Sequence, residues 1–401
     1  MASTSATTVA STIRTKYYTK LLKTAKQYLV QNRFASSKAV SGGEGDSVRV
    51  NRLLRPAIQE TASTAGTMIT ESSAKALSSN YQDLSMEIWG DSFAWNEDVD
   101  ITSFIADKDN RDVIGRQMAQ SLDYQMSKKW ATQCMRYRCD TTATNYQIAG
   151  TVDQSTVSCS TTVFGIDNTT AVGTDTFNGG YLTITNASGA NYDITKAITD
   201  TVDDSHVVTG AFPQTHAATS KGWAVVGTGL ADTASTTHLL KVSAMHEKME
   251  TEKFPRGLYR CFMAPEVHLD LMQDTTFLQS VVYDEAYHLG TYQLGRIFDI
   301  EFLVTSNCYR ESVAGAEGRG SGAVFVTPIF GTNCRSVFSF ANPGGTGQFS
   351  VKFIPVEEAD SSNLRQSKRF LSWKGVYAAG VTRATSVIGL MTGASDLEVL
   401  V

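Results

Sequence analysis

The sequence predicts a mixed α+β fold in which one long helix covers a sheet built from distant parts of the chain. Three observations support this prediction. A helical pattern without proline runs from Asp107 to Arg138. A stretch rich in Thr, Ser and Gly at 141–237 is broken by short apolar runs, as in strands joined by tight turns. The last quarter of the chain contains apolar and alternating runs that need strand partners from earlier segments.

The N-terminal part of the chain is basic. Residues 1–56 contain ten Lys or Arg against two acids, a net charge of +8, whereas the whole chain carries -5. Apolar side chains at Ile13, Tyr17 and Leu21 recur at helical spacing and predict a basic amphipathic helix at about 13–33. A basic arm on an acidic body favours association between chains or contact with a polyanion. The same composition is also typical of a mitochondrial transit peptide, which is an alternative interpretation.

A long polar excursion lies between two predicted strands. Residues 47–53 alternate apolar and polar side chains, and residues 81–89 alternate again through Leu84 and Ile88. The segment between them is polar and has no core of its own. An open loop of this length tends to be functional or to lie on a neighbouring molecule.

The helix predicted at 107–138 has an apolar face that includes Met118, Leu122 and Met126. Asp107 or Asp109 can accept hydrogen bonds from the first free amides. Positive charges, including Arg136 and Arg138, lie where the carbonyl ends collect. About 45 Å of helix at 1.5 Å per residue makes a rod longer than most globular proteins contain.

The second half of the chain predicts a compact α/β unit followed by late strands. A helix is expected from 235 until Pro255, and Pro265 suits the first turn of another helix. One buried strand is expected at 297–304. Further strands are expected at 323–330, 336–340 and 349–356, with a closing pair at 368–391. The long helix is the natural cover for this sheet.

No catalytic constellation is found in the sequence. Walker, nucleophile-elbow and H-E-x-x-H patterns are missing, and the six cysteines form no C-x-x-C pair and suit buried thiols. We expect His246 and His268 on solvated helix faces. An acidic run is interpreted as a solvated strand face, with a cation site as the alternative. Its members are Asp83, Glu87, Asp91, Glu97 and Asp98. The sequence therefore predicts no enzyme, no cofactor, no metal and, lacking a long apolar run, no membrane partner.

The order of these elements resembles that of the major capsid proteins of tailed phages, whose fold is called the Johnson fold or Hong Kong ninety-seven type. The sequences of five segments are similar to the coat-protein family named after phage N-four. They are YYTKLLKTAKQYLVQNRFA, GDSVRVNRLLRP, ITES, WGDSFAWNEDVDITSF and LGRIFDIEFLVTSN. The resemblance covers nearly the whole chain except 141–237.

The resemblance implies a domain organisation. The implied parts are an N-terminal arm (1–45), an extended loop (46–95), the spine helix with part of the peripheral domain (96–140), an inserted β-rich domain (141–237), an axial domain (238–330), and return strands of the axial and peripheral domains (331–401). Deleting residues 1–45 or 66–80 is expected to leave a foldable subunit that cannot close shells.

The implied function is that of a major capsid protein that assembles into an icosahedral shell around double-stranded viral DNA. It would form hexamers and pentamers, contact packaged DNA non-specifically, assemble in the host cytoplasm and reside in the virion. Other capsid or decoration proteins are further candidate partners. Expected inter-subunit contact residues are Arg14, Lys16, Lys20, Lys23, Lys26, Arg33, Arg49, Arg52, Arg55, Thr67 and Glu71.

Three other functions are alternatives. An encapsulin-like compartment would use the same fold to enclose an enzyme, and nucleic acid in the particles would separate it from a capsid. A cytosolic or imported α/β enzyme would use residues dispersed in sequence. A surface adhesin would bind glycans through the Thr-rich region.

Overall fold

The computed structural model describes fifteen segments of the chain, and structural statements below concern these residues. They are 30–40, 47–53, 79–96, 107–139, 147–151, 163–165, 180–184, 194–202, 205–209, 222–226, 232–277, 293–312, 323–340, 349–354 and 368–394. The chain divides into two compact units. The first comprises Met1–Val48, Leu84–Lys129 and Arg335–Gly380, and the second comprises Arg49–Asp83, Trp130–Cys334 and Val381–Val401.

The first unit contains a five-stranded sheet that joins early and late parts of the sequence. Its order is β1 (Ser36–Val40), β17 (Arg335–Phe340), β19 (Lys368–Val381) and β18 (Phe349–Ile354), and β4 (Glu87–Asn96) also pairs with β19. β1 runs parallel to β17, whereas β4 and β18 run antiparallel to β19. The prediction that late strands pair with earlier ones is confirmed.

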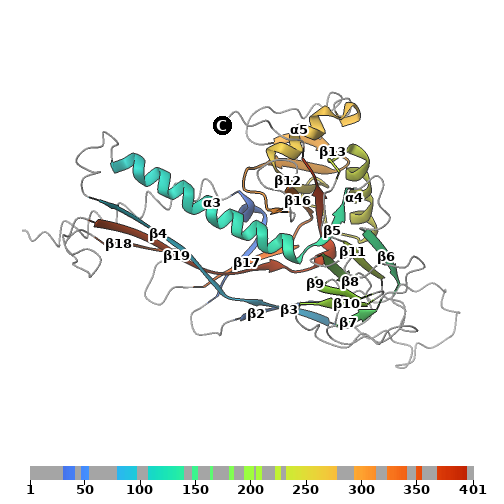
Figure 1. Cartoon of the computed structure of the whole chain (residues 1–401), viewed down its shortest axis with the longest axis horizontal. Coiled ribbons are helices and arrows are strands. Elements are labelled where there is room, and N and C mark those ends of the chain that lie inside the picture. Colours follow the sequence, from blue (N-terminus) through green and yellow to red (C-terminus); the bar gives the residue numbers. More distant parts are fainter. Residues whose placement is uncertain are drawn as a thin grey trace, which may run out of the picture. The chain divides into compact units, whose positions relative to one another are not determined.

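Helix α3 (Asp107–Gln133) lies along β4 and β19 in this unit (Figure 1). Its apolar stripe is buried, because Met118, Leu122 and Met126 are at most 1% exposed. The predicted rod-like helix is therefore confirmed, and it covers the late strand β19. The expectation of one sheet for all late strands is wrong, because β16 (Ala323–Phe330) and β20 (Val387–Thr392) belong to a second, seven-stranded sheet. The predicted end of the helix at Arg138 is also wrong.

Residues after Gln133 leave the helix and form β5 (Met135–Arg138), which runs parallel to β20. The buried Arg136 side chain folds back, and its Nε donates to the Ala131 carbonyl at 2.8 Å. Positive charge thus satisfies a carbonyl near the helix end, as expected, but from a strand outside the helix. Pairing with β20 outweighs the continuing helical pattern of the sequence.

Helix α3 also holds the first described residues of the chain in place. η1 (Gln31–Phe34) precedes β1, and the amide of Gln31 donates to the buried Asp123 carboxylate of α3 at 3.0 Å. Residues 36–40, which belong to the N-terminal arm implied for 1–45, thus pair with β17 of the same chain. The remainder of the helix predicted at 13–33 lies outside the described residues.

The second unit contains a seven-stranded sheet with the helices α4 (Thr236–Lys248) and α5 (Pro265–Gln273) (Figure 1). Pro265 opens α5 as predicted. The strand order is β13 (Gln293–Ile297), β14 (Ile300–Val304), β12 (Tyr259–Met263), β16 (Ala323–Phe330), β20 (Val387–Thr392) and β5, with β15 (Arg310–Ser312) beside β16. The short η3 (Ala384–Ser386) leads into β20.

Three predicted boundaries are wrong. The single strand expected at 297–304 is a hairpin, because Phe298 and Asp299 both adopt positive φ, of 50° and 61°, and reverse the chain. The helix expected to reach Pro255 ends at Lys248, followed by Glu250 at φ 49°. The strand expected at 81–89 is split at Met86 into β3 (Ser79–Ser85) and β4.

A separate six-stranded antiparallel sheet lies within the Thr-rich region. Its order is β6 (Gln147–Thr151), β11 (Gly222–Val226), β8 (Tyr181–Ile184), β9 (Ile194–Val202), β10 (Ser205–Val208) and β7 (Val163–Gly165). The apolar residues Leu182, Ile198 and Val208 are buried in it. A further two-stranded sheet joins β2 (Ser47–Leu53) to β3, the strands on either side of the predicted excursion.

Candidate assembly surface

Strand β4 presents an open surface in the described part of the chain. None of its described side chains, from Glu87 to Ser92, is buried, and Ile88 is 60% exposed. Among the described residues, β4 pairs with β19 alone, so its other edge carries no strand. An open edge of this length is a ready template for another chain.

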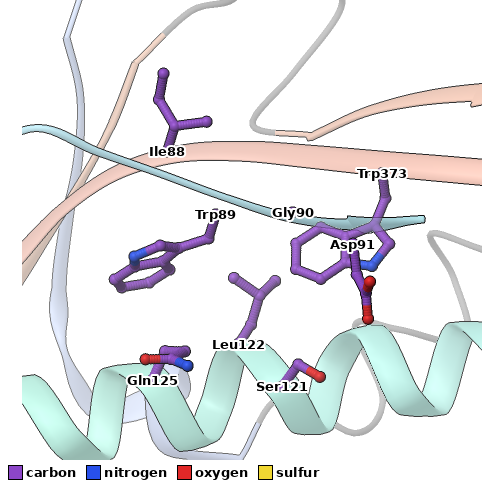
Figure 2. Close-up of a pocket in the computed structure, with 8 residues that line it drawn as sticks. All are labelled: Ile88, Trp89, Gly90, Asp91, Ser121, Leu122, Gln125 and Trp373. Atoms are coloured by element: carbon purple, nitrogen blue, oxygen red, sulfur yellow. The ribbon is translucent and has the colours of Figure 1, made fainter.

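The side of β4 that faces α3 carries Trp89 and Asp91 (Figure 2). Alternation along the strand places Glu87 on the same side. Glu87 forms an ion pair with Lys129 of the helix. The indole Nε1 of Trp89 donates to Glu87 at 3.2 Å, and its ring stacks on Tyr377 with centroids 5.8 Å apart. These contacts hold Glu87 and Trp89 in place on this face.

The far end of the same face opens into a pocket of about 330 Å³ between β4, β19 and α3 (Figure 2). Asp91 and Trp373 lie beside each other on one wall, and Ser121, Leu122 and Gln125 of α3 form the floor. Trp373 is only 5% exposed, yet its Nε1 has no hydrogen-bond partner in the described part of the chain. The pocket therefore contains a buried donor next to an accessible carboxylate.

Close approach of the two strands at this pocket requires a glycine. A Cβ added at Gly90 would lie 2.4 Å from the Trp373 carbonyl oxygen, which is backbone and cannot move aside. Gly90 thus lets β4 carry Trp89 and Asp91 tightly against β19.

The two-stranded sheet carries an exposed ion pair. Arg49 donates to both carboxylate oxygens of Asp83, at 2.7 and 2.9 Å, and its guanidinium lies 4.0 Å from the Tyr81 ring centroid. The hydrogen bond from Arg49 lowers the pKa of Asp83. Arg49, predicted to contact a neighbouring subunit, therefore already has a partner in its own chain.

The structure does not describe the side chains of the other predicted contact residues. Arg33 lies in η1 and Arg52 in β2, where only the backbone is described. The rest lie outside the described residues: Arg14, Lys16, Lys20, Lys23, Lys26, Arg55, Thr67 and Glu71. Their role between subunits stays a prediction. The sequence did flag Asp91 within its acidic run, but no local signal pointed to Trp373.

A buried polar cluster joins the six-stranded and seven-stranded sheets of the second unit. Arg136 of β5 donates to Glu311 of β15 at 2.9 Å, and the Tyr181 hydroxyl of β8 donates to the same oxygen at 3.0 Å. The guanidinium lies 4.0 Å from the Tyr181 ring centroid. Burial raises the pKa of Tyr181, so the phenol stays protonated and keeps donating. This cluster fastens the Thr-rich sheet to the seven-stranded sheet.

His246 is buried, so the expectation of a solvated helix position is wrong. Its ring stacks on Tyr259 with centroids 4.7 Å apart. Nε2 lies 3.1 Å from the Ile329 carbonyl and Nδ1 lies 3.2 Å from the Thr251 hydroxyl. Burial lowers the pKa of His246 to about 3, so the neutral ring donates to Ile329 and accepts from Thr251. Both nitrogens serve the fold.

No group of three or more His, Cys, Asp or Glu in the described segments is placed to hold a metal ion. The five described cysteines are free and buried, as expected for these thiols. No described helix is long and apolar enough to cross a membrane.

No protein-family model matches this sequence, and no curated protein matches it. Solved structures do match. The capsid of Ralstonia phage GP4 is 14% identical with a TM-score of 0.50, covering 92% of this chain and 90% of that chain. The capsid of cyanophage Pam1 is 10% identical with a TM-score of 0.48, covering 92% and 93%. The SrpI encapsulin complex of Synechococcus elongatus is 9% identical with a TM-score of 0.44, covering 93% and 90%.

The likeness to the Ralstonia phage GP4 capsid extends over nearly the whole of both chains. At 14% identity it establishes the fold and leaves function to be argued separately. Assignment to the N-four type family and the subdivision into arm, loop, axial and peripheral domains stay predictions. The chain therefore has the α+β fold of tailed-phage capsid proteins, as the sequence predicted.

Proposed function

We propose that this chain is the major subunit of an icosahedral shell that encloses double-stranded viral DNA. The observation that carries the proposal is the fold, which follows the Ralstonia phage GP4 capsid chain along 92% of this sequence. The step from shared fold to shared function is our inference.

The exposure of β4 supports assembly. A shell subunit touches neighbours on several sides, so a strand with little burial in its own chain can gain burial between copies. Residues 87–92 fit this requirement, because they offer an open edge and an exposed Ile88. The long α3 behind them supplies a rigid support.

A structural role also agrees with how the buried polar groups are used. Asp123 binds backbone amides, Arg136 binds Glu311, and His246 bonds a carbonyl and a hydroxyl. Each of these groups is committed to holding elements together. We therefore propose a subunit without enzymatic activity of its own.

The test is the assembly state of the purified chain. Sedimentation velocity and negative-stain electron microscopy should show closed particles of uniform diameter. A chain that stays monomeric over a wide range of concentration and salt would contradict the proposal.

The contents of the particles test the second half of the proposal. Particles isolated from the natural source should contain DNA that is protected from added nuclease. Particles that contain an enzyme and no nucleic acid would instead indicate a compartment shell, the first alternative.

A further inference from the structure

We infer that the pocket between β4, β19 and α3 binds a lysine or arginine side chain from the basic segment 12–29 of a second copy of this chain. The inference rests on the proposed function, because it needs a second copy within reach. The contact would lie on the side of β4 that faces α3.

Two carboxylates on the same face of β4 differ in their partners. Glu87 has a cation, Lys129, directly across from it on α3. Asp91 lies near the uncharged Ser121, and the described residues give it one hydrogen bond, from the Ser92 amide at 2.8 Å. Asp91 is exposed, so a cation from outside can reach it.

Besides a cation for Asp91, the pocket needs a hydrogen-bond acceptor for the indole of Trp373. The Trp373 residue is 5% exposed, and its Nε1 has no hydrogen-bond partner among the described residues, which is costly for a buried donor. A peptide supplies both missing groups at once, since its carbonyl accepts from an indole and its basic side chain pairs with a carboxylate. A free metal ion supplies only the second.

The aromatic rings suit the stem of such a side chain. Trp89 and Trp373 flank Leu122 across the pocket (Figure 2). Indole faces attract cations and also cover the methylene groups of lysine or arginine. A volume of about 330 Å³ leaves room for such a side chain with its adjoining backbone.

The N-terminal segment has the matching charge. Residues 1–29 contain no acid, and their five basic residues are Arg14, Lys16, Lys20, Lys23 and Lys26. In each chain the amides of residues 30 and 31 bond Asp123. Asp123 is turned roughly 160–200° around α3 from Ser121 and Gln125, at 100° per residue. A chain's own segment thus starts from the helix face opposite the pocket, which favours a second copy as the donor.

The direct experiment measures binding of a fluorescently labelled synthetic peptide of residues 12–29 to the unassembled full-length protein by anisotropy. We expect Asp91→Asn to weaken binding about fivefold or more at low salt, because a charge-assisted hydrogen bond is lost. Trp373→Phe should also weaken it, by removing the donor. The control Asp200→Asn removes another exposed carboxylate, on β9, and should leave the affinity unchanged. Equal affinity for Asp91→Asn and the parent would overturn the inference.

A mixing experiment tests whether the contact joins two copies. One variant carries Asp91→Lys, and the other carries Lys16→Glu, Lys20→Glu and Lys23→Glu. Each should assemble poorly alone, with unchanged thermal unfolding, and their mixture should recover assembly because opposite charges meet between chains. Recovery only when all four changes share one chain would overturn the assignment to a second copy.

The outcomes separate this inference from the proposed function. If the parent chain forms shells but the peptide affinity does not depend on Asp91, the pocket assignment is wrong and the proposed function stands. If the peptide affinity depends on Asp91 but the parent chain never assembles, the proposed shell function is wrong. The pocket then remains a site for basic peptides.

Discussion

Strands β16 and β4 are both long, and they are buried to opposite degrees. Every described side chain of β16, from Val324 to Phe330, is buried. No described side chain of β4 is. β16 pairs with β12, β15 and β20, whereas β4 pairs with β19 alone among the described strands. Among the described residues, β16 is thus fully packed by its own chain, whereas one edge of β4 has no strand beside it.

This difference separates two kinds of damage. A substitution in β16 removes packing that the subunit needs to fold, so it should lower the free energy of unfolding. A substitution on the open side of β4 removes little packing within the chain, so it should affect the association of copies. Four substitutions or conditions test this distinction.

The largest effect is expected from Phe330→Ala in β16. Phe330 is fully buried, stacks on Phe262 with centroids 5.5 Å apart and meets Phe254 edge-on at 5.8 Å. Truncation leaves a cavity and should lower the free energy of unfolding by about 3–5 kcal/mol. Urea denaturation of the unassembled subunit measures this. A loss below about 1 kcal/mol would mean that the strand is less well packed than its burial indicates.

The next effect is expected from Glu311→Ala, which breaks the polar cluster between the six-stranded and seven-stranded sheets of the second unit. The Arg136 side chain is completely buried and would keep an uncompensated charge. Loss of one partner of a buried pair costs about 3 kcal/mol or more. Hydrogen exchange should also show faster exchange in β8, because Tyr181 loses its acceptor. Glu247→Gln, at an exposed pair with Lys253, is the control and should change little.

The burial of β16 could be predicted from the sequence because AVFVTPIF is a nearly continuous apolar run. The end of α3 could not, because Met135–Arg138 continues a helical pattern and becomes a strand only by pairing with β20, which comes much later in the chain. The turn at Phe298 and Asp299 also gave no local signal, since it contains neither Asn nor Gly. Tertiary pairing decided these positions.

The pocket shows the same limit for the candidate site. Asp91 stood out as part of an acidic run, and Trp89 alternates with it on one strand face. Trp373 comes from the far end of the chain and meets them only through the pairing of β4 with β19, in which it lies opposite Asp91. The sequence therefore indicated Asp91, and only the sheet register supplied its neighbour Trp373.

Acid should destabilise the core around β16 through His246. Its pKa is about 3 in the folded chain and about 6.5 when unfolded, so the unfolded state binds the proton more readily between these values. Stability is complete above pH 6.5 and falls as the pH drops toward 3, by roughly 2 kcal/mol at pH 5. Urea denaturation at pH 7.5 and pH 5 measures the change. His246→Gln should reduce the pH dependence by this amount, and an unchanged dependence would contradict the assignment.

The smallest effect on folding is expected from Ile88→Ser on β4. Ile88 is 60% exposed, so little of its apolar surface is buried within the chain, and the free energy of unfolding should change by less than about 0.5 kcal/mol. Assembly should nevertheless weaken, because the removed side chain lies beside the open strand edge where a neighbouring copy would pack. Sedimentation velocity on the variant and the parent, at equal concentration and salt, measures this. If Ile88→Ser instead unfolded as readily as Phe330→Ala, β4 would be completed by its own chain, and the distinction between the two strands would fail.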